Sequence, residues 1–224
     1  MKIIFGAGIV FLMCWINILP VWAEPDEISN KECRSCHRFS LNEKYSKKGP
    51  DLFYAGNKYY QTWLENFLQS PTALHKLVNS SQSGLLRKKQ KVNRPHIFLT
   101  KDESKRVSNF LMKLRITGLE MGKVDKKKLS KSERSHGKIL FERDFSCISC
   151  HRALNLVGKI RGGVSGASMV NSGLRLNPDW VFNWLKNPKK FFSESGMPVY
   201  NLNEETAVLI TKYILSIRTS RKKK

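Results

Sequence analysis

The chain has 224 residues, of which 40 are Lys or Arg and 18 are Asp or Glu, so its formal net charge is +22. With 41% hydrophobic and 10% aromatic residues, it is too apolar for a disordered polar chain and long enough for one large or two small cores. Only the N-terminal segment approaches the length and hydrophobicity of a membrane span, which argues against a polytopic membrane protein.

The first 23 residues have the pattern of an export signal. A basic residue and a long apolar run open the chain, and Val21 and Ala23 place small residues where signal peptidase cleaves. We therefore expect residues 1–23 to be a signal peptide, with an uncleaved membrane anchor as the alternative. The corresponding location is the periplasm, with membrane association as a further possibility.

Four of the five cysteines lie in two copies of one pentapeptide, Cys33-Arg34-Ser35-Cys36-His37 and Cys147-Ile148-Ser149-Cys150-His151. Two cysteines on one turn can each add to a vinyl group of the same porphyrin, and the adjacent histidine then faces the iron. The copies predict two covalently bound haem c groups. The cofactor-binding residues are Cys33, Cys36 and His37 for the first haem, and Cys147, Cys150 and His151 for the second.

Other cysteine chemistries fit this spacing less well. A zinc ribbon places its cysteine pairs about 15 to 20 residues apart, whereas Cys147 follows Cys33 by 114 positions. A thioredoxin-type pair needs no adjacent histidine and belongs in a βαβ pattern that this sequence does not show. Two disulfides would leave both histidines unexplained.

Through these two motifs the chain resembles bacterial c-type cytochromes made of two fused class I cytochrome c domains. The resemblance implies an all-α fold with two tandem domains, each wrapped around one covalent haem. It divides the chain into the signal segment, domain 1 (24–119), a basic linker (120–131) and domain 2 with a basic tail (132–224). Gly49-Pro50-Asp51-Leu52 is similar to the family's loop below the haem.

An internal repeat supports the two-domain division. Trp63-Leu64-Glu65-Asn66-Phe67-Leu68-Gln69-Ser70-Pro71 matches Trp180-Val181-Phe182-Asn183-Trp184-Leu185-Lys186-Asn187-Pro188, and each copy predicts a helix that proline ends. Each half then closes with another amphipathic helix. The first begins at Thr100 with Glu103 at capping-box spacing, and the second begins near Asn203.

The helix that precedes the second haem motif also fits the family. Gly137 and Phe141 are similar to the residues that let the first helix of a class I domain cross closely over the last, which carries Tyr213 here. The first half lacks this pattern between Pro25 and Glu32, so we expect its opening helix to be short or absent.

The expected sixth iron ligands differ between the halves. Met197 stands before Pro198 and the last helix, where the resemblance places a methionine ligand, and a thioether raises the reduction potential. Met169 is a more distant candidate. In the first half the matching position holds Arg94, which cannot bind iron.

His96, two residues after Arg94, is the main candidate for the first haem and would give bis-histidine ligation with a lower potential. His75, Met112 and Met121 are other candidates. An open or water-bound iron is the remaining alternative. His136 is expected on the surface of a helix.

The basic residues gather in three clusters, at 87–94, at 123–134 and at 218–224. Nucleic acid is the usual partner of such clusters, but export and haem argue against it, and the chain carries no recognition motif. We expect an acidic redox partner protein, or an anionic membrane surface.

The function that these observations favour is electron transfer between redox partners, with the second haem ligated by His and Met and the first lacking the usual Met. The alternatives are a haem enzyme or ligand sensor with an open or displaceable site on the first haem, and a haem subunit of a larger oxidoreductase complex. The sequence favours an electron-transfer protein over an enzyme.

Overall fold

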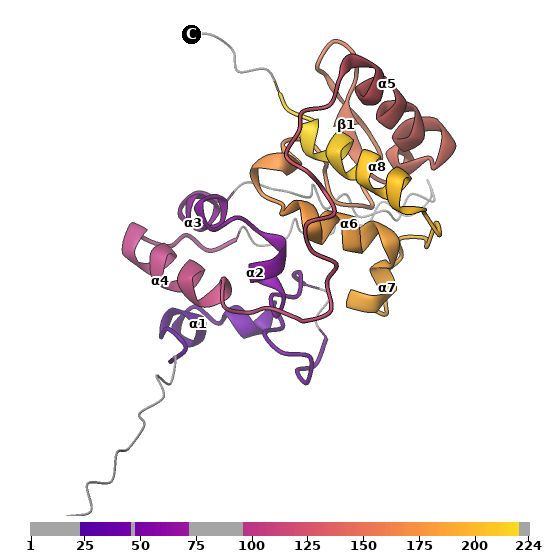
Figure 1. The fold of residues 1–224 in the computed structure, drawn as a ribbon. Coiled ribbons are helices and arrows are strands. Elements are labelled where there is room, and N and C mark those ends of the chain that lie inside the picture. Colours follow the sequence, from indigo (N-terminus) through magenta and orange to yellow (C-terminus); the bar gives the residue numbers. More distant parts are fainter. Residues whose placement is uncertain (1–22, 46–47, 72–95, 220–224) are drawn as a thin grey trace, which may run out of the picture.

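The computed structural model describes residues 23–45, 48–71 and 96–219, and these form a mainly α-helical protein (Figure 1). The predicted signal peptide, except its last residue, lies outside this part of the chain. So do His75, Arg94, the basic cluster at 87–94 and the end of the C-terminal tail. None of the helices within the described ranges is long and apolar enough to cross a membrane.

The first half of the chain contains short helices around the first Cys-x-x-Cys-His motif. Their bounds are α1 (Glu27–Asn30), the 3-10 helix η1 (Cys33–Ser35), α2 (Ala55–Lys58), α3 (Gln61–Gln69) and α4 (Lys101–Leu111). In Figure 1 these helices lie together, apart from the group formed by the second half.

The second half repeats this order with additions. Its elements are α5 (Lys131–Ile139), the π-helical turn η2 (Leu140–Asp144), η3 (Cys147–Ser149), β1 (Arg152–Leu154), β2 (Ile160–Gly162), η4 (Ser172–Leu174), α6 (Pro178–Lys186), α7 (Pro188–Phe191) and α8 (Glu204–Ser216).

The predicted helix ends are confirmed where the chain carries capping signals. The Thr100 hydroxyl accepts a hydrogen bond from the Glu103 N–H, and the Glu103 carboxylate accepts one from the Thr100 N–H, which completes a capping box. The Asn203 side chain caps α8 by accepting from the Thr206 N–H. Helix α6 ends at Lys186, and Pro188 begins the next helix.

The small sheet is a departure from the all-α prediction. Strands β1 and β2 pair antiparallel, with Arg152 opposite Gly162. The Asn155 side chain closes the turn by accepting hydrogen bonds from the N–H groups of Val157 and Lys159. Strands of three residues are too short to show an alternating hydrophobic pattern, so the sequence pattern did not reveal them.

Both halves dock their last helix in the same way. A Cβ on Gly56 would lie 2.1 Å from the carbonyl oxygen of Met112, and a Cβ on Gly173 would lie 2.1 Å from that of Leu215. The glycines are 117 positions apart and the carbonyls 103, which are the offsets of the corresponding sequence repeats. The repeated sequence therefore folds into repeated packing, in which only glycine fits.

The opening helices of the two halves differ. In the second half, a Cβ on Gly137 would lie 2.8 Å from the Tyr213 Cβ, and the rings of Phe141 and Tyr213 are 5.6 Å apart between centroids. The predicted close crossing of α5 and α8 is therefore confirmed. In the first half, α1 has only four residues, as expected from its missing pattern.

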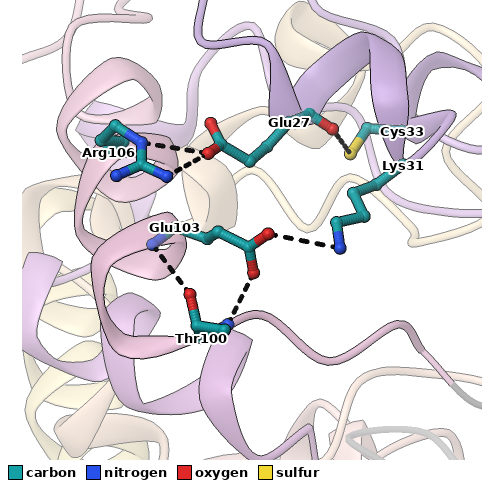
Figure 2. A network of polar contacts seen from close by, with 6 residues as sticks. All are labelled: Glu27, Lys31, Cys33, Thr100, Glu103 and Arg106. Atoms are coloured by element: carbon teal, nitrogen blue, oxygen red, sulfur yellow. Dashed lines mark hydrogen bonds and ion pairs between the residues drawn. The ribbon is translucent and has the colours of Figure 1, made fainter.

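Polar contacts join α1 to α4 in place of that crossing (Figure 2). Arg106 forms an ion pair with Glu27, and Lys31 pairs with Glu103 at 3.3 Å. The Cys33 thiol donates to the Glu27 carbonyl oxygen at 3.7 Å between sulfur and oxygen. The first Cys-x-x-Cys-His motif is thus tied to α4 through one short, ion-paired helix.

The halves meet directly before their tryptophan helices. Tyr59 and Leu176 form an isolated antiparallel bridge. The Tyr60 N–H donates to the Arg175 carbonyl at 3.0 Å, and the Asn177 N–H donates to the Lys58 carbonyl at 2.9 Å. Tyr59 and Leu176 are also 117 positions apart, so equivalent residues of the repeat face each other, as across a two-fold axis.

Aromatic packing extends this contact. The ring of Tyr54 stacks on Trp180, with 4.5 Å between centroids, and Phe53 and Phe191 complete a buried cluster. A larger apolar core contains side chains from both halves. The halves are therefore packed together.

The predicted linker lies against the second half. Asn183 of α6 accepts from the Glu120 N–H at 2.9 Å and donates to the Glu120 carbonyl at 2.8 Å. Gly122 donates its N–H to the Asp179 carboxylate. Residues 126–128 are exposed, as expected for solvated lysines.

Candidate functional site

The two Cys-x-x-Cys-His motifs adopt the same backbone conformation. Each begins after a residue with positive φ, which is 52° at Glu32 and 50° at Ser146. The His37 N–H donates to the Cys33 carbonyl at 3.0 Å, and the His151 N–H donates to the Cys147 carbonyl at 2.9 Å. The 3-10 turns η1 and η3 therefore place two cysteines and one histidine alike in both halves.

The cysteines of both motifs are free thiols. Burial raises the pKa of Cys33 and raises that of Cys147 to about 11, so both are protonated at neutral pH. None of the four motif cysteines is in a disulfide, so each motif presents two thiols on one turn.

Both motif histidines are held through one ring nitrogen. Nδ1 of His37 donates to the Pro50 carbonyl at 2.8 Å, and Nδ1 of His151 donates to the Ala167 carbonyl at 2.7 Å. Because a carbonyl only accepts, Nδ1 carries the proton and Nε2 keeps its lone pair. Burial lowers the pKa of both imidazoles, which favours this neutral form. This is the usual arrangement of a metal-binding histidine.

Glycines lie against the two rings. A Cβ on Gly49 would come within 2.6 Å of His37 Cε1, and a Cβ on Gly166 within 2.6 Å of His151 Cε1. Each glycine directly precedes the residue whose carbonyl accepts from the ring. The loop Gly49-Pro50-Asp51-Leu52 therefore has a counterpart at 166–169, which accepts the hydrogen bond from the ring of His151.

Met169 belongs to that counterpart loop. Its N–H donates to the Arg152 carbonyl at 2.8 Å, as the Leu52 N–H does to the Arg38 carbonyl at 2.8 Å. Both side chains are buried in the apolar core. Met169 thus packs where Leu52 packs in the first half, as a core residue of the loop that holds His151.

His96 lies beside His37. The centroids of their rings are 6.1 Å apart, with an angle of 54° between the ring planes. Nδ1 of His96 donates to the Ile97 carbonyl at 2.9 Å, so its Nε2 also keeps a lone pair. The ring of Phe67 from α3 lies 5.3 Å from that of His96 between centroids.

The other candidates for the first site are placed differently. Met112 follows α4, where its carbonyl faces Gly56, and its counterpart in the second half is Leu215. Met121 is 61% exposed in the linker. His136 lies exposed on α5, as predicted.

Met197 lies half-buried between α7 and α8. Its Sδ accepts a hydrogen bond from Trp184 Nε1 at 3.1 Å. Trp184 and Phe67 occupy the same position of the repeated helix, 117 residues apart. One helix position therefore supports the candidate ligand in each half, His96 in the first and Met197 in the second.

Three contacts were not predicted from the sequence. Trp184 and Phe67 occupy the aromatic position of the repeated helix. The sequence predicted only that this position belongs to the apolar face of the helix, not that its side chains contact Met197 and His96. Arg38 forms a two-pronged ion pair with the buried carboxylate of Asp51, with N···O distances of 3.0 and 2.6 Å. Asp51 belongs to the Gly49-Pro50-Asp51-Leu52 loop, so its place in that loop is the sequence feature that pointed toward this ion pair.

Within residues 23–45, 48–71 and 96–219, no group of three or more His, Cys, Asp or Glu side chains is arranged to hold a metal ion. Comparison of the chain with protein-family models found no match. Searches of curated proteins and of solved structures likewise found no similar protein.

Proposed function

We propose that this chain is an exported dihaem c-type cytochrome that carries single electrons between redox partners. The observation that supports it most is the repeated histidine geometry. In both motifs a half-buried imidazole donates through Nδ1 to a carbonyl and keeps Nε2 free, directly after two free thiols on one turn. The proposed units are two class I cytochrome c-like domains, 24–119 and 132–224.

The residues present fit a covalent haem. Cys33 and Cys36 would bind the porphyrin of the first group while His37 binds its iron, and Cys147, Cys150 and His151 would do the same for the second. Gly49 and Gly166 leave the space that the histidine rings occupy. When bound, each haem supplies an iron that gains and loses one electron, and the chain orients and buries it.

The first iron would take His96 as its sixth ligand. An imidazole nitrogen binds a metal ion at about 2 Å, so two rings facing one metal have centroids roughly 6 Å apart. The observed separation of His37 and His96 is 6.1 Å. Their free Nε2 atoms supply the two lone pairs that such a site requires.

The second iron would take Met197. A thioether stabilises ferrous iron, whereas two imidazoles favour a lower potential. Electrons would then pass from the first haem to the second with a favourable free energy. The Trp184 hydrogen bond orients the Met197 sulfur.

The exposed basic residues suit an acidic protein partner. Within the described ranges, residues 126–128, Arg134 and Arg218 are exposed. Such charges speed the encounter with an acidic protein, and salt weakens the contact. An anionic membrane surface is the alternative partner of the C-terminal cluster.

The test is a haem count on the full chain produced with the bacterial haem-attachment machinery. Mass spectrometry of the denatured protein is expected to show two haems on wild type and one on Cys33→Ala or Cys147→Ala. Ser35→Ala and Ser149→Ala, which alter the same turns without removing a thiol, are expected to keep both.

Two results would decide against the proposal. A wild-type chain without covalent haem would overturn it, and so would a single cysteine variant that keeps two haems. A wild-type protein with a high-spin haem that binds carbon monoxide would favour the enzyme or sensor instead.

A further inference from the structure

The hairpin of β1 and β2 ends in an apolar tip, which we define as residues 156–160. The tip exposes three apolar side chains, Leu156 with 91% of its surface, Val157 with 74%, and Ile160. Asn155 and Gly158 already supply the turn, because the Asn155 side chain accepts from two N–H groups and Gly158 has a φ of 74°. The turn itself therefore gives no reason for apolar residues at its end.

The main chain of the apolar tip satisfies its own hydrogen bonds. The N–H groups of Val157 and Lys159 donate to the Asn155 side chain at 3.1 and 2.8 Å. The Gly158 N–H donates to the Asn155 carbonyl at 3.0 Å, and the Asn155 N–H donates to the Lys159 carbonyl at 2.9 Å. Three successive N–H donors of the tip thus need no water, which removes a large cost of placing a turn in an apolar environment.

Within the described ranges, the protein leaves the apolar tip uncovered. A Cβ on Gly158 would meet no atom within 4 Å, so the turn projects from the surface. All three residues of β2 are exposed. In Figure 1, β1 lies on the side of the second half that is far from α1 and α4. The apolar side chains are therefore available to a partner outside the chain.

Cations lie beside the apolar tip. Lys159 is exposed within it, while Lys138 and Arg161 each pair with one oxygen of the Glu142 carboxylate. The Glu142 side chain is only 12% exposed and that of Arg161 is 43% exposed, so the cation is the partner that faces solvent. One shallow depression joins these charges to the tip, and it is lined by Lys138, Glu142, Asn155, Leu156, Val157 and Arg161.

Three kinds of partner can cover such a tip, and charge and shape separate them. A second copy of the chain is disfavoured, because each copy carries a formal charge of +22 and brings the same cations. A protein partner buries its apolar anchors in fitted pockets within a broad contact, whereas this tip projects. A bilayer needs no fitted pocket. It takes up projecting apolar side chains at the headgroup boundary, and anionic headgroups attract the cations beside them.

We propose that the apolar tip is a membrane-docking site for an anionic phospholipid bilayer. Leu156 and Val157 enter the headgroup boundary, and Lys159 and Arg161 bind lipid phosphates. Because β1 begins directly after His151, docking holds the second half of the chain against the membrane. This site goes beyond the proposed electron transfer and does not rest on it, since the tip contains no residue of either Cys-x-x-Cys-His motif.

The experiment measures co-sedimentation of the haem-loaded protein, purified in soluble form after export, with large lipid vesicles. Vesicles of phosphatidylglycerol and phosphatidylcholine in equal parts are compared with vesicles of phosphatidylcholine alone. Leu156→Ser is expected to lower the partition coefficient on the anionic vesicles about tenfold, because an inserted leucine leaves water. Val157→Ser should add to that loss. Leu41→Ser is the matched control, since Leu41 is a 65% exposed leucine of the first half, and it should bind as wild type does.

The same assay tests the charges. Lys159→Gln is expected to weaken binding to the anionic vesicles about fivefold and to leave binding to the neutral vesicles unchanged. Lys105→Gln removes the same charge from an exposed position of α4, far from the tip, and is expected to match wild type at physiological salt.

Two outcomes would overturn the membrane site. One is a wild-type protein that stays in solution with the anionic vesicles, which would leave a protein as the partner of the tip. The other is a Leu156→Ser protein that sediments as wild type does, because basic residues elsewhere would then account for the binding. Neither outcome changes the haem count, so the proposed function is tested separately.

Discussion

The indole nitrogen of Trp184 donates a hydrogen bond to the sulfur of Met197, with 3.1 Å between Nε1 and Sδ. In the first half, Phe67 occupies the same helix position and packs on the ring of His96. One position of the repeated helix therefore supports a different candidate ligand in each half. This relationship gives the two proposed haems unlike environments on one common framework.

Trp184→Phe is expected to weaken the hold on Met197 while leaving the helix packed. The variant removes one hydrogen bond, which contributes about 1 kcal/mol. Because 1 kcal/mol corresponds to a factor of about five in an equilibrium constant, imidazole added to the protein should bind the second haem about five times more tightly. Optical titration measures this. Trp63→Phe, in the other half, should leave the titration unchanged; equal effects of both variants would contradict the role of Trp184.

His96→Ala is expected to leave the iron of the first proposed haem without its second protein ligand. Removal of the second imidazole leaves His37 alone on the iron, so a high-spin signal should appear in the electron paramagnetic resonance spectrum and carbon monoxide should bind one haem. His136→Ala serves as the control, because His136 is an exposed residue of α5. A spectrum of His96→Ala identical to wild type would exclude His96 as a ligand.

Gly166→Ala is expected to displace His151, because the new methyl group would lie 2.6 Å from the ring. Overpacking of this kind costs about 1 to 3 kcal/mol of unfolding free energy. Urea unfolding should show that loss, with a fall in the yield of covalently bound haem. Gly49→Ala should act alike on the first site, whereas Gly196→Ala meets no atom within 4 Å and should be neutral. A Gly166→Ala protein as stable as Gly196→Ala would be evidence that the close contact of Gly166 with the His151 ring does not matter for stability.

The Glu27–Arg106 ion pair makes the stability of the first half depend on pH. The hydrogen bond from Arg106 lowers the pKa of Glu27 below its ordinary value of 4.5. A carboxyl group with a lowered pKa stabilises the fold above its unfolded pKa, and this contribution is lost as the pH falls through the folded pKa. Glu27→Gln should therefore lower the urea midpoint at pH 7 and make little difference in strong acid.

Glu32→Gln is the control for that measurement, since Glu32 is exposed and directly precedes the first Cys-x-x-Cys-His motif. It should match wild type at both pH values. If Glu27→Gln unfolds at the wild-type urea concentration at pH 7, the ion pair does not stabilise α1 against α4.

Much of the local structure was predictable from neighbouring residues. The capping box at Thr100 and the end of α6 before Pro188 follow from short patterns of neighbouring residues. The close approach of Gly137 to Tyr213 was implied by the family resemblance. The mainly α-helical class follows from the same patterns. The cysteine and histidine motifs identified the candidate site because their chemistry lies within five consecutive residues.

The sequence by itself determined the repeat, the two candidate sites and most helix ends, because these depend on residues close together in the chain. Only the tertiary structure decided that His96 faces His37 and that Trp184 reaches Met197. It also decided that Tyr59 and Leu176 meet in an antiparallel bridge between the halves. Those contacts depend on how distant segments turn and pack, and the burial of their side chains is a property of the whole fold.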